Sequence, residues 1–164
     1  MFKLLFGANP TNFESAYSLD ESVRRLSAAT SASAFKVLTS QAAVGRVSRD
    51  RVSLQRVIPF VSNSFKPIFV GQFHETAGKV VLAGRFTLHW FTRAFMTFWF
   101  GFGMLWTAMA TIVLAVAPQP GLWWFPLAGL GVIACGFCIV MLCKWFARND
   151  ASWLSKVIQT ALSK

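Results

Sequence analysis

The residues best suited to bind a metal or to act as nucleophiles are three cysteines and two histidines. Cys135, Cys138 and Cys143 fall in or at the end of a long uncharged stretch, and no histidine lies near them in the sequence. A structural zinc ion needs four ligands in a tetrahedral arrangement, and the remaining ligands are missing here. Thiols in an apolar helix behave as small apolar side chains. We therefore expect no metal ion, no cofactor and no structural disulfide.

The histidines also lack the surroundings that catalysis requires. Neither His74 nor His89 stands in an H-x-x-x-H or H-E-x-x-H pattern. The chain has only 6 Asp and Glu residues, which leaves few groups for general acid–base work. We expect no enzyme activity. A small membrane enzyme would have to use polar groups where His89 and Arg93 reach the bilayer.

Basic side chains are the third candidate for chemistry, because the net charge is +10. Most of the basic residues that could act together lie in one short stretch, and two more follow it: Arg46, Arg49, Arg51, Arg56, Lys66 and Arg85. Arginine offers a planar fork of donors to phosphate or carboxylate groups. This set either contacts lipid phosphates or an acidic partner, or forms a solvated hairpin face. No zinc-finger spacing or RNA-binding aromatic signature is present, so we expect no nucleic-acid partner.

A long window without charged residues separates the chain into parts that need separate interpretation. No Asp, Glu, Lys or Arg occurs from Ala94 to Cys143. A helix needs about 20 apolar residues to cross a bilayer, so the window has room for two. The segment 117–121 contains two prolines and a glycine, which end one helix and turn the chain. The sequence predicts a transmembrane hairpin over 93–146, with spans of about 94–117 and 122–145.

Flanking charges predict the orientation of this hairpin. The connecting segment has no basic residue, whereas Arg85 and Arg93 precede the first span and Lys144 and Arg148 follow the second. Basic flanks stay on the cytoplasmic side. We expect a two-span protein of the cytoplasmic (inner) membrane, with the lipid bilayer as its first partner and both termini in the cytoplasm.

Small residues recur along both spans at the spacing of one helix face. They are Gly103, Thr107 and Thr111 in the first span, and Ala128, Gly131, Cys135 and Cys138 in the second. Such stripes let helices approach closely in lipid. They either pack the hairpin against itself or dock a partner helix or a second copy.

The first part of the chain predicts a small α+β domain over 1–92. Apolar residues at helical spacing indicate a helix over about 19–31. Alternating segments separated by polar or glycine-containing turns indicate four antiparallel strands at about 43–47, 52–57, 68–73 and 79–86. The last strand runs into the first span without a linker, so the domain is expected to lie close to the membrane.

The final residues, 147–164, predict a short amphipathic helix. Its apolar residues share one face: Trp153, Leu154, Val157, Ile158, Ala161 and Leu162. That face suits either the membrane interface or the surface of the soluble domain. We assign 147–164 as an interfacial amphipathic helix, with packing on the soluble domain as the alternative.

Three stretches carry a resemblance: NSFKPIFVG at 63–71, GRFTLH at 84–89 and FMTFWFG at 95–101. Together with the helix at 17–26, they resemble uncharacterised bacterial membrane proteins with an N-terminal α+β domain and a C-terminal two-helix hairpin. The resemblance covers most of the first hundred residues. It implies a bacterial source and this layout, and it transfers no catalytic or binding residues.

These features favour a non-enzymatic interaction protein, either an accessory subunit of a membrane-protein complex or a module that assembles as a homo-oligomer. The first alternative is a protein that binds or handles anionic lipid headgroups through the basic set. The second alternative is a small membrane enzyme.

Overall fold

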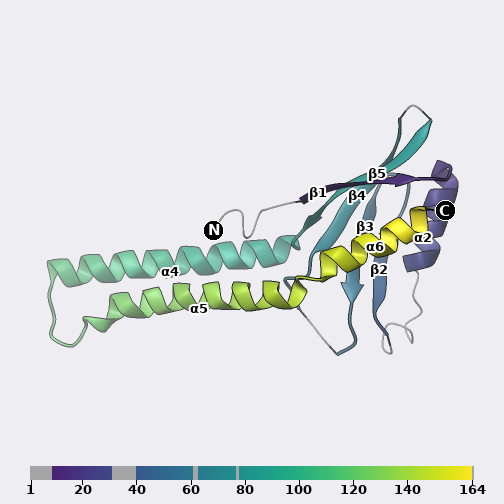
Figure 1. Ribbon diagram of the computed structural model, residues 1–164. Coiled ribbons are helices and arrows are strands. Elements are labelled where there is room, and N and C mark those ends of the chain that lie inside the picture. The colour runs from purple at the N-terminus through teal and green to yellow at the C-terminus, as the bar shows by residue number, and fades with distance from the viewer. Residues whose placement is uncertain (1–8, 31–39, 61–62, 77, 164) are drawn as a thin grey trace. The chain divides into compact units, whose positions relative to one another are not determined.

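The computed structural model of the chain describes residues 9–30, 40–60, 63–76 and 78–163 (Figure 1). The chain forms two compact units. One combines Met1–His89 with Phe146–Lys164 and is called the sheet domain below. The other is Trp90–Trp145. The class is α+β, as the sequence predicted.

A single antiparallel sheet forms the centre of the sheet domain. Its strands are β1 (Asn9–Ser15), β2 (Ala42–Val47), β3 (Val52–Val57), β4 (Ile68–Thr76) and β5 (Lys79–Thr87). Their order in the sheet is β1-β5-β4-β3-β2. Strands β2 to β5 therefore form a meander, and β1, drawn in purple, lies at one edge beside β5 (Figure 1).

The prediction of four strands was wrong, because β1 is a fifth. It pairs with β5 along its whole length, with Phe13 opposite Leu82. Phe13 is the one buried apolar residue of the segment, and Pro10 is tolerated there because β1 is an edge strand. A single apolar side chain gives no detectable alternation of apolar and polar residues. The strand therefore forms because it pairs with β5, and its own sequence does not predict it.

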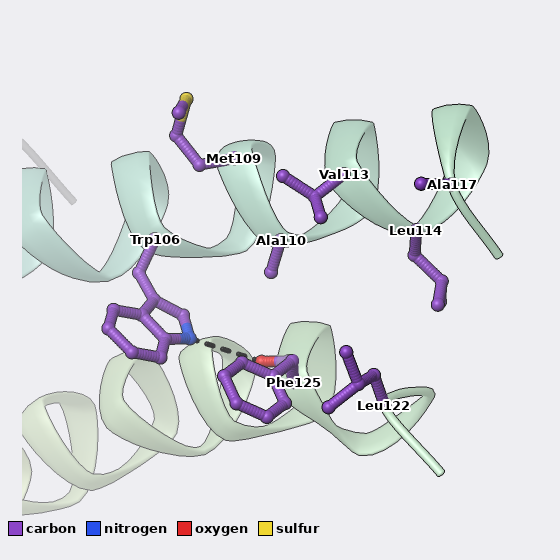
Figure 2. A pocket seen from close by; sticks show the side chains of 8 residues that line it. All are labelled: Trp106, Met109, Ala110, Val113, Leu114, Ala117, Leu122 and Phe125. Carbon is purple, nitrogen blue, oxygen red and sulfur yellow. Dashed lines mark hydrogen bonds between the residues drawn. The ribbon is translucent and has the colours of Figure 1, made fainter. Parts of the chain in front are cut away.

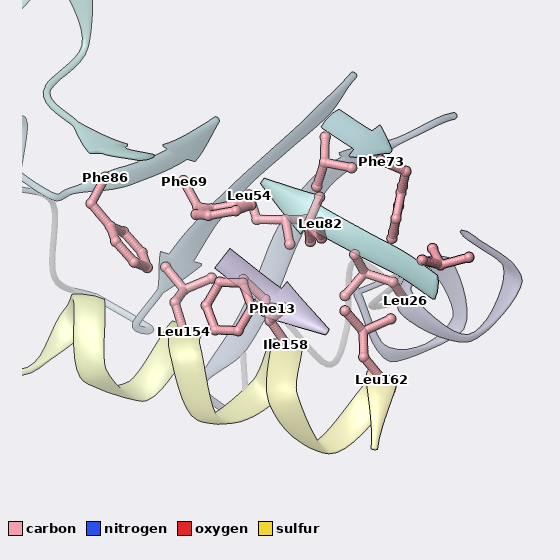
Figure 3. Close-up of a cluster of buried hydrophobic side chains, with 13 residues drawn as sticks. Phe13, Leu26, Leu54, Phe69, Phe73, Leu82, Phe86, Leu154, Ile158 and Leu162 are labelled. Atoms are coloured by element: carbon pink, nitrogen blue, oxygen red, sulfur yellow. The ribbon is translucent and has the colours of Figure 1, made fainter. Parts of the chain in front are cut away.

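The core of the domain lies between one face of the sheet and two helices, α2 (Leu19–Thr30) and α6 (Asp150–Leu162). From α6, Leu154, Ile158 and Leu162 are fully buried at four-residue spacing. Figure 3 shows their side chains directed at Phe13 and Leu26. Burying each of these aliphatic side chains contributes about 1.5–3 kcal/mol.

The position of α6 corrects the interfacial placement of 147–164. The apolar face of this helix is used by the core of the sheet domain, which is the other of the two placements that its sequence allowed. The domain boundary at residue 92 is corrected with it. The sheet domain consists of two separate segments, and the hairpin is inserted between β5 and α6.

The inserted unit is a pair of helices, α4 (Trp90–Val116) and α5 (Trp124–Ala147). They contain 27 and 24 residues. At 1.5 Å per residue each is longer than a hydrocarbon core of about 30 Å. Both are long and apolar enough to cross a membrane. Gly121 in the connection has φ of 98°, a conformation that glycine adopts without strain.

Candidate functional site

The six basic residues proposed as lipid or partner contacts do not form one surface. Arg46 on β2 and Arg85 on β5 share a cross-strand row on the sheet face opposite the core, with Ser53 and Val70 between them. Both arginines are exposed. Neighbouring strands are about 4.8 Å apart, so these two backbone positions are separated by roughly 14 Å. This spacing suits contact with one extended surface rather than with a single phosphate group.

Arg49 and Arg51 are exposed and lie between β2 and β3. Arg49 forms an ion pair with Asp20 in the first turn of α2. This contact connects the turn to the helix through two solvent-exposed side chains, a kind of pair that contributes little to stability. The charge of Arg49 is thus balanced by Asp20, whereas Arg51 lies in the same turn with its side chain exposed to solvent.

Arg56 is directed to the core side of the sheet, away from Arg46. Its Nη1 donates to Oδ1 of Asp150 at 2.8 Å, and its Nη2 donates to Oε1 of Gln41 at 2.6 Å. The guanidinium also lies over the ring of Trp153, 4.9 Å from its centroid. The Arg56 side chain is 12% exposed and that of Asp150 only 3%. Arg56 thus joins β3 to the first turn of α6, which corrects its assignment to an exposed arginine cluster.

A cavity of about 560 Å³ lies at the end of β3 and in the connection to β4. Its polar and aromatic lining residues are Gln55, Arg56, Phe60, Asn63, Ser64 and Lys66. The fold therefore brings together two of the six predicted basic residues, Arg56 and Lys66, in one concave site. Nε of Arg56 is buried and has no hydrogen-bond partner within the described part of the chain.

A second charged group occupies the surface of α2. Glu21 accepts hydrogen bonds from Nε of Arg24 at 2.8 Å and from Nε of Arg25 at 2.7 Å. The contact with Arg24, followed by that with Arg25, lowers the pKa of Glu21 from 4.5 to about 2. Arg25 also lies 3.9 Å from the centroid of the Tyr17 ring. These contacts make the start of α2 a self-contained ion-pair network.

In the helical unit, two tryptophans on α4 bind the backbone of α5 in the same way. Nε1 of Trp99 donates to the carbonyl of Val132 at 3.0 Å, and Nε1 of Trp106 donates to that of Phe125 at 3.1 Å. The donors are seven residues apart, and so are the acceptors. This repeat fixes the register of two antiparallel helices with polar contacts that need no charged group.

Glycines on α5 make room for these indoles. A Cβ atom at Gly136 would lie 2.7 Å from the Trp99 indole, and one at Gly129 would lie 2.3 Å from Oγ1 of Thr107 and 2.8 Å from Cδ1 of Trp106. On α4, a Cβ at Gly103 would lie 2.7 Å from Ile133. The helices therefore approach closely because these three positions carry no side chain.

This arrangement agrees with only part of the predicted small-residue stripes. Gly103 and Thr107 lie at the helix contact, whereas Thr111 is exposed and donates to the carbonyl of Thr107 in its own helix. On α5, Ala128 is half-buried, and Gly131, Cys135 and Cys138 are exposed. At 100° per residue these last three lie on the side of α5 opposite Gly129 and Gly136. These three therefore do not pack within the hairpin, which is one of the two alternatives that the sequence left open, because the sequence pattern does not fix the rotation of α5.

A cavity of about 270 Å³ lies between the end of α4 and the start of α5 (Figure 2). Among the lining side chains, Met109, Val113 and Leu122 are apolar. The only polar atom drawn from a side chain there, Nε1 of Trp106, donates to the carbonyl of Phe125. This cavity offers hydrocarbon contacts and no group for acid–base or metal chemistry.

The histidines and cysteines lie apart in the parts of the chain that the structure covers. His74 is exposed on β4, with its Nε2 2.9 Å from Nε2 of Gln72, and His89 is exposed after β5. Across residues 9–30, 40–60, 63–76 and 78–163, no three His, Cys, Asp or Glu side chains are grouped so that they could hold a metal ion.

Comparison with protein-family models, with curated proteins and with solved structures finds no match to this chain. The resemblance to bacterial membrane proteins therefore stays a prediction.

Sequence reasoning missed five residues that organise the two units. Asp150 is the ion-pair partner of Arg56, 94 positions away, and no sequence signal links them. The helix contact depends on Trp99 and Trp106 with Gly129 and Gly136, and here a signal exists. Both pairs have seven-residue spacing, which places each pair on one helix face.

Proposed function

We propose that the chain is a two-span protein of the cytoplasmic membrane whose sheet domain and hairpin form a non-enzymatic interaction module. The observation that supports membrane insertion is the pattern of exposure on α4 and α5. Their outward surfaces carry large apolar side chains, including Phe98, Leu105, Ile112, Leu130 and Leu142. In water such a surface would be strongly unfavourable, whereas hydrocarbon accepts it.

The discontinuous sheet domain supports a hairpin topology. Its core contains residues from before α4 and from α6, after α5. One folded core cannot be shared across a bilayer, so both ends of the hairpin belong on one side. The basic flanks Arg93, Lys144 and Arg148 favour the cytoplasm. We expect reporters at residues 119 and 164 to show opposite locations, and a cytoplasmic reporter at 119 would contradict the topology.

The exposed side of α5 supports assembly through the membrane. Gly131, Cys135 and Cys138 are directed away from the contact with α4, so this small-residue surface is not used inside the hairpin. Small residues on an outward helix face allow another helix to approach. This surface of α5 would bind either a second copy of the chain, which gives a homo-oligomer, or a helix of another membrane protein, which makes the chain an accessory subunit.

The native cysteines make this proposal testable without adding new residues. Oxidation in native membranes should link two copies through Cys135 or Cys138, because disulfides form when Cα atoms approach within about 4.4–6.8 Å. The link should survive Cys143→Ser and disappear in Cys135→Ser/Cys138→Ser. A wild-type protein that gives no crosslink, and that leaves the membrane in mild detergent as a monomer without a partner, would contradict assembly.

The observation that favours a second function, binding of anionic lipid headgroups, is the cavity shared by Arg56 and Lys66. For a small membrane enzyme, no group of three His, Cys, Asp or Glu side chains among the described residues offers a metal site.

A further inference from the structure

The two contacts between a tryptophan of α4 and a glycine of α5 lie seven residues apart on both helices. One further step of seven leads from Trp106 to Val113 on α4, and from Gly129 to Leu122 on α5. At this third step a valine stands where the series would place an indole. The cavity of about 270 Å³ lies here, and both Val113 and Leu122 line it (Figure 2). The cavity therefore takes the place of a third tryptophan in a regular series.

The lining of this cavity suits neither water nor a polar ligand. Its side chains are apolar except for the indole nitrogen of Trp106, which already donates to the carbonyl of Phe125 at 3.1 Å. Apolar cavities stay dry, and an empty one loses the dispersion contacts of its lining. Met109 and Val113 are 55% and 54% exposed, so the cavity opens to the surroundings of the hairpin. Hydrocarbon from those surroundings is therefore the filling that its chemistry favours.

The dimensions of the cavity match a single acyl chain. Its lining on α4 extends from Trp106 to Ala117, which is about 16 Å along the helix axis. One leaflet of a hydrocarbon core measures about 15 Å. An apolar cavity of about 150 Å³ holds the six carbon atoms of benzene, so about 270 Å³ has room for about ten or eleven carbon atoms. A side chain from a neighbouring helix would enter sideways and fill only part of this length.

The stacked rings of Trp106 and Phe125 bound the cavity at the end farther from the connecting loop. Their centroids are 6.1 Å apart and their planes differ by 8°. The other end reaches Ala117 and Leu122, at the two sides of that loop. If the hairpin crosses the membrane as proposed, the cavity lies within the leaflet on the loop side. A lipid of that leaflet can then enter with its chain parallel to α4.

We propose that this cavity binds one acyl chain of a phospholipid from the leaflet on the loop side. Because no charged residue occurs from Ala94 to Cys143, the hydrocarbon chain is recognised and the headgroup charge is not. The inference rests on the proposed membrane insertion. It extends that proposal by assigning a ligand and a binding site to the hairpin.

The test uses the full chain in nanodiscs of phosphatidylcholine that carries a photoactivatable carbene precursor in the middle of one acyl chain. After irradiation, mass spectrometry should find adducts on Leu114 and Phe125, which line the cavity and are half-buried. Ile112 is 58% exposed outside the cavity, so its adducts measure contact with bulk lipid. Adducts on Ile112 without adducts on Leu114 and Phe125 would overturn the site, whether the cavity is closed or holds a protein helix.

Filling the cavity should remove the bound chain. An indole is large enough to occupy most of this volume, so Ala110→Trp should abolish the adducts on Leu114 and Phe125 and leave those on Ile112. The matched control is Ala108→Trp, since Ala108 is exposed and lies 200° from Ala110 around the helix. Equal losses in the two variants would contradict the site.

A second variant guards against local misfolding. Val113→Trp, which continues the tryptophan series, fills the same cavity from another position and should also abolish the adducts. If Ala110→Trp loses the adducts and Val113→Trp keeps them, the loss does not come from filling the cavity and the inference is wrong.

Stoichiometry distinguishes a bound chain from passing lipid. Native mass spectrometry of the protein released from nanodiscs should show one phospholipid per wild-type chain and per Ala108→Trp chain, and none on Ala110→Trp. A wild-type chain that retains no phospholipid would reduce the adducts to transient contact and contradict binding.

Two further arms test the headgroup and separate this inference from the proposed function. Replacing phosphatidylcholine by phosphatidylglycerol should leave the adducts and the bound phospholipid unchanged, and a strong preference for either lipid would contradict recognition through the chain alone. Retention of the protein in the bilayer after an alkaline wash tests insertion alone. A retained protein without adducts on Leu114 and Phe125 disproves this site and leaves the membrane assignment intact.

Discussion

At the scale of residues, the pair Arg56–Asp150 joins β3 to α6 through two largely buried charged side chains. We expect Asp150→Asn to leave a largely buried guanidinium without a counter-charge. Removing one partner of a buried ion pair lowers stability by about 3–5 kcal/mol. Because the Arg56 side chain is 12% exposed, we expect a loss of stability near or below the lower end of that range. Since 1 kcal/mol corresponds to about 4–8 °C in a domain of this size, Tm of the full chain in micelles should fall by at least about 8 °C.

The matched control is Asp50→Asn, which removes the same charge from an exposed position between β2 and β3. Replacing both members of the pair, as in Arg56→Met with Asp150→Leu, should restore much of the lost stability because no charge then stays buried. If Asp150→Asn melts no lower than Asp50→Asn, the pair does not stabilise the contact between β3 and α6.

At the scale of elements, the glycines of α5 determine how closely the two apolar helices pack. Gly129→Ala and Gly136→Ala each place a Cβ within 2.3–2.7 Å of Thr107 or Trp99. Overpacking of this kind costs about 1–3 kcal/mol, and it should also disturb the indole hydrogen bonds. Gly101→Ala meets nothing within 4 Å and should be neutral or stabilising, because alanine favours the helix by about 1 kcal/mol.

Thermal unfolding in micelles and the near-ultraviolet circular dichroism of the indoles measure both effects. We expect Gly136→Ala to lower the thermal stability and Gly101→Ala to leave it unchanged or raise it. Equal changes at the two positions would mean that the helices do not depend on this close approach.

The same elements show what sequence could and could not predict. The spans follow from a window without charges, and β2 to β5 follow from alternation and turn residues, because both signals are local. The strand β1 has one buried apolar residue and takes its place from β5, so its signal is not local. The partner of Arg56 lies 94 residues away, and the inward side of α5 depends on a rotation that composition leaves open. The apolar face of α6 suits a bilayer or a sheet equally well, and only the completed core decides between them.

At the scale of the whole molecule, the sheet domain should fold without the hairpin, provided that both of its segments are kept. Residues 1–89 alone lack α6, so Leu26, Leu82 and their neighbours would lose the cover of Leu154, Ile158 and Leu162. We expect that fragment to aggregate. A variant in which about ten Gly and Ser residues replace 90–145 restores the core, and such a linker has a root-mean-square span of about 17 Å.

This variant should be soluble and monomeric, and it should unfold cooperatively with the circular dichroism of an α+β domain. The control is the same variant with Leu154→Asp and Ile158→Asp, which should fail to fold because two charges would enter the core. A soluble, cooperative fragment 1–89 would contradict the discontinuous domain. It would also remove the structural reason for placing both ends of the hairpin on one side of the membrane, which is that α6 completes a core that begins before α4, and would leave only the basic flanks in support.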